Sequence, residues 1–218
     1  MDVISKSSKY DMGGMASPPL SRKESQAQTR ARLIAVGREH FLRYGLAESV
    51  AERIAAEAGY TRGALYANFR NKDELFLAVM QSSVETEILN FRSILESDRS
   101  VQERFQMMRE SVGNLVTNPA WVLLQAEFQA KALRDETVRV AFLEQQERRR
   151  ADGAMLLREC VSQLGLVLSA SPEEVVAVLT SLTEGLALRQ AISGQRDPAH
   201  AKQLAMLCFD RLVSREEH

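Results

Sequence analysis

One short segment carries five side chains that can donate hydrogen bonds to a nucleic acid: Thr61, Arg62, Tyr66, Asn68 and Lys72. An arginine guanidinium can pair bidentately with the acceptors on a guanine edge, and hydroxyl, amide and ammonium groups donate to phosphate. In a helix, Arg62 and Tyr66 lie four residues apart and share one face. Gly63 and Ala64 keep that face low, so the backbone can approach a partner closely. We therefore interpret Arg62 as a base reader, the alternative being a solvated charge at a helix end.

The segment that must position these side chains, residues 50–69, contains two short helical patterns separated by a glycine. The apolar residues of the first pattern share one helix face: Ile54, Ala55 and Ala58. Gly59 ends this helix, since glycine adopts a left-handed conformation at little cost. Thr61 stands at the N-cap of the second helix, whose buried face carries Leu65 and Phe69. The pattern predicts a helix-turn-helix, in which the second helix enters a DNA major groove.

The composition is that of a helical globular protein. Of 218 residues, 45% are hydrophobic and 26% charged, with five prolines and eleven glycines. Ala, Leu, Glu, Arg and Gln are plentiful, which favours helix, and no run alternates over enough residues to predict a sheet. Residues 1–80 carry 12 basic and 9 acidic side chains, and residues 81–218 carry 16 and 20. The positive excess suits phosphate contact, although without the motif random variation explains it as well.

Several classes of protein are disfavoured. Cys160 and Cys208 lie far apart on apolar stripes, so we expect buried free thiols in a reducing cytoplasm rather than a disulfide or a metal site. No apolar run reaches 18 residues and no signal-peptide core stands near the start, so we expect a soluble cytoplasmic protein without membrane contact. His40 lies on an apolar stripe and is interpreted as a hydrogen-bonded core residue. Because we find no base–nucleophile pair, metal spacing or phosphate loop, we expect neither an enzyme nor a cofactor.

The chain divides into three predicted regions. Residues 1–25 are rich in Ser, Gly, Pro and Lys and are expected to be a mobile arm, with the true start at Met1, Met12 or Met15. Residues 26–80 form the helix-turn-helix domain, whose first helix covers 26–44 and ends at Gly45. Residues 81–218 form a helical regulatory and dimerisation domain. A single long helix over residues 71–98 joins the two domains, and later helices are predicted at 101–117, 120–133, 136–166, 171–193 and from 198.

These residues resemble the TetR family of bacterial transcriptional regulators. The resemblance covers roughly residues 28–80, through TRARLI from Thr29, then Phe41 and Gly45, then IAAEAGYTRGALYANFRNKDELF from Ile54. The spacing of Gly63, Phe69 and Lys72 within this segment makes the match more specific than a bare helix-turn-helix. The resemblance implies an all-α fold of about nine helices. In it, an N-terminal three-helix DNA-binding domain is joined by a long helix to a C-terminal ligand-binding and dimerisation domain.

The resemblance also assigns roles to particular residues. It implies that Tyr66 contacts a phosphate or a thymine methyl group. Val50 stands where the family usually has a hydroxyl residue, so the neighbouring Ser49 is the substitute candidate for a phosphate contact. His40 replaces a usual leucine, and Asn68 replaces a common His or Tyr. The expected DNA-binding set is Ser49, Thr61, Arg62, Gly63, Ala64, Tyr66, Asn68 and Lys72.

Two further sites are expected in the second domain. An apolar effector cavity is predicted to be lined by Met107, Met108, Trp121, Leu124, Phe128 and Phe142, the alternative being that these residues are plain core. The last two helices carry much apolar surface at a chain end, which predicts either core closure or half of a four-helix dimer interface. The residues predicted for that interface are Leu182, Leu186, Ala187, Leu204 and Cys208.

The sequence therefore predicts a ligand-responsive transcriptional repressor. It would bind a palindromic double-stranded DNA operator as a homodimer and be released by a small apolar or amphipathic effector. Repression is favoured over activation because nothing resembles a polymerase-contacting module. The alternative is a helical protein-interaction module with a helix-turn-helix shape but no specific operator.

Overall fold

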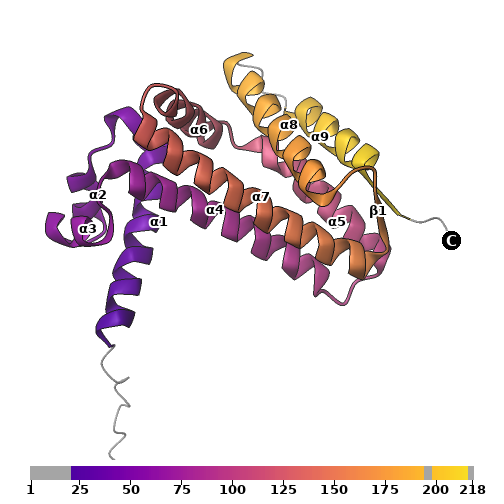
Figure 1. Ribbon diagram of the computed structural model, residues 1–218, viewed down its shortest axis with the longest axis horizontal. Helices are drawn as coiled ribbons and strands as arrows, with labels where there is room; N and C mark the ends of the chain where they lie inside the picture. The colour runs from indigo at the N-terminus through magenta and orange to yellow at the C-terminus, as the bar shows by residue number, and fades with distance from the viewer. Residues whose placement is uncertain (1–20, 194–197, 216–218) are drawn as a thin grey trace, which may run out of the picture.

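The computed structural model describes residues 21–193 and 198–215, and within them the chain is almost entirely helical (Figure 1). The expected all-α fold is confirmed. Residues 1–20, which hold most of the predicted arm and the three candidate start codons, lie outside the described residues. The helices are α1 (Arg22–Glu48), α2 (Ala51–Glu57), α3 (Arg62–Asn68), α4 (Lys72–Leu95), α5 (Val101–Asn114), the 3-10 turn η1 (Leu115–Thr117), α6 (Pro119–Ala132), α7 (Glu136–Leu164), α8 (Pro172–Ser193) and α9 (Pro198–Leu212).

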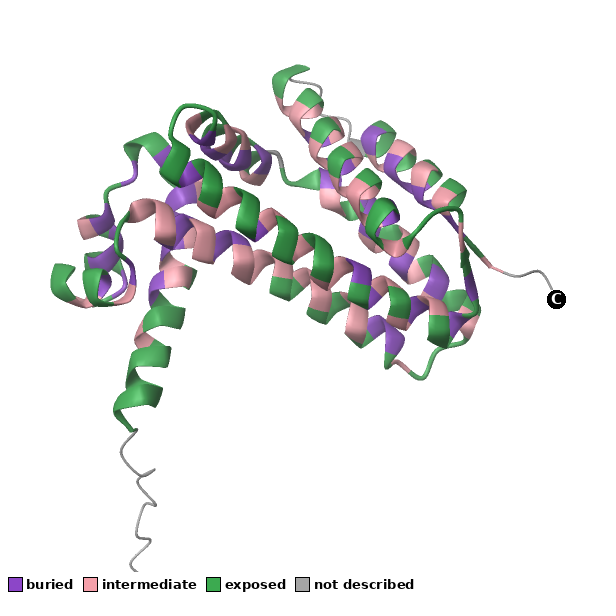
Figure 2. Cartoon of the chain, in the orientation of Figure 1, coloured by how far each residue is buried: buried purple, intermediate pink, exposed green. Residues whose placement is uncertain are grey.

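The first helix is longer at both ends than the sequence predicts. It begins four residues early because Ser21 and Glu24 form a capping box, each side chain bonding the other's backbone N–H. The predicted break at Gly45 is present as a kink: its φ of 75° and ψ of 170° are non-helical, and one further turn follows before Ser49. The start of α1, residues 22–32, is almost wholly exposed and points away from the other helices (Figure 2).

The long helix α4 links the two ends of the molecule. Asn71 caps its first turn by accepting a hydrogen bond from the Glu74 N–H, and the two acidic residues there suit the helix N-terminus. Along its length α4 packs against α7, and the two helices run side by side through the body of the molecule (Figure 1). The opposite side of the body is made by α8 and α9, which pack against each other and against α6, α7 and α5. The predicted helix boundaries here hold to within a few residues.

One element contradicts the sequence prediction of a sheet-free chain. Residues Leu166–Leu168 (β1) and Val213–Arg215 (β2) form an antiparallel pair in which Leu166 lies opposite Arg215. Each strand has three residues, too few to show alternation, and the partner is remote in sequence. Gly165 turns the chain out of α7 with a φ of 61°, and this allows β1 to begin.

The core falls into separate clusters of buried side chains. One joins α1, α2, α3 and the start of α4 to α6 and α7, and its centre is a group of aromatic rings: Phe41, Phe76, Trp121, Phe128 and Phe142. A second fills the far end between α4, α5, α7 and α9. His40 is 2% exposed, and its Nδ1 lies 3.0 Å from Glu57 Oε2, which confirms the predicted hydrogen-bonded core histidine.

Candidate DNA-binding site and effector cavity

The helix-turn-helix forms where the sequence predicts it. Gly59 has a φ of 81°, which carries the chain out of α2, and Thr61 Oγ1 accepts a hydrogen bond from the Ala64 N–H at 3.2 Å as the N-cap of α3. Leu65 and Phe69 are completely buried beneath α3. This burial fixes the rotation of α3, so the side carrying Arg62 and Tyr66 faces solvent.

A carboxylate that the sequence analysis missed lies among the predicted DNA-reading side chains. The Arg62 Nε is 3.2 Å from Glu52 Oε1, and the Tyr66 hydroxyl donates to the same oxygen at 3.4 Å. The Arg62 guanidinium carbon also lies 5.4 Å from the centre of the Tyr66 ring. Glu52 belongs to α2, so it holds the Arg62 and Tyr66 side chains from the neighbouring helix. The opposite charges of Glu52 and Arg62 could have suggested this pair. Sequence spacing alone, however, does not indicate which residues of two helices are in contact.

Two predicted phosphate-binding residues have other partners in the structure. The Ser49 hydroxyl is buried and donates to the Gly45 carbonyl at 2.6 Å, so its predicted place on the DNA-binding surface is wrong. The Lys72 ammonium donates to the carbonyls of Leu46 at 2.7 Å and Ser49 at 2.8 Å. Burial lowers the pKa of Lys72, and nearby Lys131 lowers it further. Lys72 thus ties the end of α1 to the start of α4, and its contact with DNA phosphate stays a prediction.

The remaining predicted residues lie on or beside α3. Asn68 is partly buried, and its amide nitrogen donates a hydrogen bond to the Ala64 carbonyl in the last turn of α3 at 2.8 Å. Gly63 is exposed, and a Cβ there would meet only the Thr61 hydroxyl at 3.7 Å. The surface around Gly63 is therefore low and open. Val50 begins α2 without a side-chain cap and is 44% exposed, consistent with the missing hydroxyl at this position.

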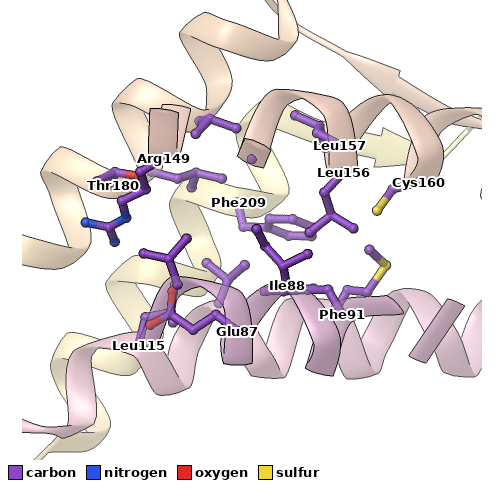
Figure 3. Close-up of a pocket in the computed structure, with 16 residues that line it drawn as sticks. Glu87, Ile88, Phe91, Leu115, Arg149, Leu156, Leu157, Cys160, Thr180 and Phe209 are labelled. Carbon is purple, nitrogen blue, oxygen red and sulfur yellow. The ribbon is translucent and has the colours of Figure 1, made fainter. Parts of the chain in front are cut away.

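At the other end of the molecule an apolar cavity of about 140 Å³ lies between α4, α5, α7, α8 and α9. For scale, an engineered cavity of about 150 Å³ holds one benzene molecule. Figure 3 shows Glu87 and Arg149 at one end and Leu157 and Cys160 toward the other. The lining residues are Val84, Glu87, Ile88, Phe91, Met108, Val112, Leu115, Arg149, Gly153, Leu156, Leu157, Cys160, Val176, Leu179, Thr180 and Phe209.

The sequence located this cavity poorly. Of the six predicted lining residues, Met108 alone is among those that surround it. Leu124 and Phe128 are buried in the cluster beneath the DNA-binding helices, and Trp121 and Phe142 pack against that cluster. Met107 packs against the core of the far end. Helical spacing indicates which residues are buried but not which neighbour each one faces, so an effector role for the other five predicted residues stays a prediction.

The ionisable side chains of the cavity differ in their partners and in the direction of their pKa shifts. The Arg149 Nη1 lies 2.6 Å from Glu184 Oε1, so this base already has an acidic partner. Glu87 makes no ion pair or hydrogen bond with any described residue. Burial raises the pKa of Glu87, and the nearby Arg149 charge partly opposes that shift. The Cys160 thiol, also in the wall, has its pKa raised to about 12 by burial, so it is protonated at neutral pH.

Helix α6 connects the cavity domain to the DNA-binding helices. The Leu46 N–H donates to Glu127 Oε2 at 2.8 Å, next to the kink of α1. Lys131 of α6 pairs with Asp73 at 2.6 Å in the first turn of α4. The rings of Phe76 in α4 and Phe128 in α6 also pack against each other, with their centres 4.9 Å apart. A displacement of α6 would therefore reach α1 and α4 directly.

The predicted dimer residues differ in their environment. Ala187 is 1% exposed and belongs to a core cluster formed with α9 and η1, so its predicted place on a free surface is wrong. Leu182, Leu186, Leu204 and Cys208 are partly exposed. Among the described residues α8 is long and apolar enough by composition to cross a membrane, yet only 17% of its most apolar window is buried. The apolar side chains that α8 and α9 leave exposed are Val178, Ile192 and Leu207.

Comparison with known proteins agrees with this architecture. Residues 33–79 match the family described as bacterial regulatory proteins, tetR family, and residues 102–214 match the BetI-type transcriptional repressor, C-terminal. The second match alone covers more than half of the chain. The chain belongs to the TetR family. Membership of this family confirms the resemblance noted from residues 28–80 and extends it to the cavity domain.

Curated relatives match a part of the sequence. The HTH-type transcriptional regulator TtgR of Pseudomonas putida is 42% identical over 64 residues, 29% of this chain and 30% of TtgR. SrpR of Pseudomonas putida is 34% identical over 85 residues, 39% of this chain and 40% of SrpR. The matched segments thus span well under half of these relatives.

Solved structures share the fold over most of the chain. A regulator from Rhodococcus sp. superposes with a TM-score of 0.67 at 18% identity, covering 86% of this chain and all of that one. The reduced form of E. coli NemR superposes with a TM-score of 0.63 at 20% identity, covering 88% and 100%. At these identities the likeness concerns the fold alone.

Proposed function

We propose that this TetR-family protein is a cytoplasmic, ligand-responsive repressor that binds a palindromic operator as a homodimer. The observation that carries the proposal is the presence, on one chain, of an exposed α3 face bearing Arg62 and Tyr66 and of an apolar cavity lined by α4. Helix α4 begins at Lys72, against the end of α1, and carries Glu87 at the cavity roughly 22 Å further along. A ligand that prefers a different position of α4 and α6 would shift the population away from the DNA-binding form.

In this proposal Arg62 reads a guanine edge and Tyr66 contacts the adjacent backbone or a thymine methyl group. On binding, Arg62 exchanges its exposed pairing with Glu52 for hydrogen bonds to a base, which costs little because surface ion pairs are weak. Thr61, at the start of α3, lies near enough to the same face to donate to phosphate. The homodimer is proposed from the apolar side chains that α8 and α9 leave exposed, and two α3 helices would then read two half-sites.

Binding to palindromic duplexes taken from beside the protein's own gene would test the proposal. We expect fluorescence anisotropy to show tighter binding to the palindrome than to a scrambled duplex. Sedimentation of the free protein should give twice the 24.4 kDa chain mass. Arg62→Ala should lose roughly ten- to a hundredfold in affinity for the palindrome but little for the scrambled duplex. Arg99→Ala, at an exposed arginine before α5, is the matched control. Equal loss on both duplexes would remove Arg62 as a base reader, and no sequence preference in the wild type would favour an interaction module.

A further inference from the structure

A negatively charged side chain lies on the surface that is proposed to read DNA. Glu52, the second residue of α2, has 41% of its side chain exposed, and Arg62 beside it has 71% exposed. Both contacts of the carboxylate fall on one oxygen: Oε1 lies 3.2 Å from Arg62 Nε and accepts a hydrogen bond from the Tyr66 hydroxyl at 3.4 Å. Oε2 accepts no hydrogen bond from any described residue. Glu52 therefore offers a free acceptor beside the arginine that is proposed to read a guanine.

Such a carboxylate is unfavourable against DNA unless it gains a partner there. Phosphates carry negative charge, so Glu52 cannot serve as a phosphate contact and instead weakens non-specific binding. In the free protein, Arg62 offsets the charge of Glu52. In the proposed complex Arg62 turns to a base, and the carboxylate loses its cation as it is brought against the duplex. A charged group that is left without a partner is costly, so the complex favours a sequence that supplies a hydrogen-bond donor to Glu52.

The donors available in the major groove are the amino groups of cytosine and adenine. Guanine and thymine present acceptor oxygens at the corresponding edge, and these repel a carboxylate. Adenine places the acceptor N7 next to its amino group, whereas the cytosine amino group has no acceptor beside it on the same base. A carboxylate therefore fits cytosine best. The 3.2 Å between Arg62 Nε and Glu52 Oε1 is close to the roughly 3.4 Å between successive bases along a strand, so the two side chains can address neighbouring base pairs.

We propose that Glu52 is a second base reader, which requires a cytosine in the base pair next to the guanine read by Arg62. This inference rests on the proposed function, because it places α3 in a major groove. Glu52 selects mainly by exclusion: where its carboxylate faces guanine or thymine it meets an acceptor, and the affinity falls. A carboxylate that only held Arg62 in position would act differently, since its removal would weaken the preference for guanine itself.

Selection of duplexes from a random pool by the full-length protein gives the preferred half-site without a known operator. Fluorescence anisotropy then compares duplexes that carry each of the four bases at the position next to the guanine. We expect the wild type to lose roughly tenfold or more in affinity when guanine or thymine replaces cytosine. N4-methylcytosine, which still pairs with guanine but presents a methyl group in place of the outward N–H, should cause a similar loss. The amide in Glu52→Gln can donate as well as accept, so this variant should bind the guanine and thymine duplexes nearly as well as the cytosine duplex.

Glu39→Gln is the matched control, because it removes an exposed carboxylate that also pairs with an arginine, Arg38, at 3.3 Å in α1. This control should keep the preference of the wild type. Three results would overturn the inference: an unchanged preference in Glu52→Gln, loss of the preference for guanine instead, or a wild type that accepts N4-methylcytosine as well as cytosine. A wild type that selects no sequence would refute the proposed function as well, whereas a selected sequence that Glu52→Gln leaves unchanged would refute this inference alone.

Discussion

Replacing Lys72 distinguishes a structural role from a DNA contact. Lys72→Met keeps the aliphatic chain and removes an ammonium that donates to the Leu46 and Ser49 carbonyls at 2.7 and 2.8 Å. A hydrogen bond from a charged donor contributes about 1.5–3 kcal/mol, and part of this is offset here because burial of the ammonium is itself unfavourable. Water can reach some of the freed carbonyls. We therefore expect the free energy of unfolding to fall by about 1–3 kcal/mol.

The measurement is urea unfolding of the full chain followed by circular dichroism. Lys23→Met, at an exposed lysine in the first turn of α1, is the control and should leave stability unchanged. DNA binding of Lys72→Met should weaken on specific and scrambled duplexes alike, because the loosened end of α1 no longer fixes α2. The slope of log affinity against log salt concentration should stay as in the wild type.

The opposite pair of results would refute this reasoning. If Lys72 mainly contacts a phosphate, as the sequence predicts, its removal should flatten the salt slope by about 0.9. In that case stability should be unchanged. Unaltered unfolding together with a flatter slope would therefore assign the ammonium to DNA rather than to the joint between α1 and α4.

Three further changes have distinct expected results. Gly45→Ala should lower the free energy of unfolding by about 1–3 kcal/mol, since φ 75° and ψ 170° favour glycine and a Cβ would lie 3.3 Å from Glu127. Gly185→Ala within α8 is the control, and an equal change in the free energy of unfolding in both variants would contradict this reasoning. Glu52→Gln should strengthen binding to every duplex several-fold in anisotropy and reduce discrimination, because it removes a negative charge beside Arg62, whereas weaker binding would count against it. At pH 8 the Cys160 thiol, with its pKa of about 12, should react with a disulfide reagent far more slowly than Cys208, and rapid reaction of the Cys208→Ser variant would show otherwise.

The DNA-binding helices could be predicted from sequence because local signals define them. Gly59 and Thr61 mark a turn and a cap within a few residues, and the burial of Leu65 and Phe69 follows from helical spacing. These features also fix which way Arg62 points. Local chemistry was thus sufficient to predict both the element and its exposed side.

Contacts between helices could not be predicted in the same way. The pairing of Glu52 with Arg62, and that of Lys72 with the end of α1, depend on how two helices cross, which periodicity does not report. Most of the cavity wall could not be predicted for the same reason, since Phe128 and Phe209 look alike in sequence but belong to different clusters of buried side chains. The short β1–β2 pair joins residues that α8 and α9 separate in the sequence, so no local pattern indicates it.

The aromatic cluster shared by Phe76 and Phe128 has a consequence for anyone building hybrid regulators from this chain. A cut after residue 80 would separate Phe76 from its ring partner and leave Leu46 without its acceptor on Glu127. The transplanted DNA-binding domain would expose to its new partner domain an apolar surface that is normally buried. The C-terminal domain left behind would expose the matching apolar surface. An exchange that keeps α6 together with α1 to α4 would preserve the Phe76–Phe128 and Leu46–Glu127 contacts. The unit that can be exchanged is therefore discontinuous in sequence.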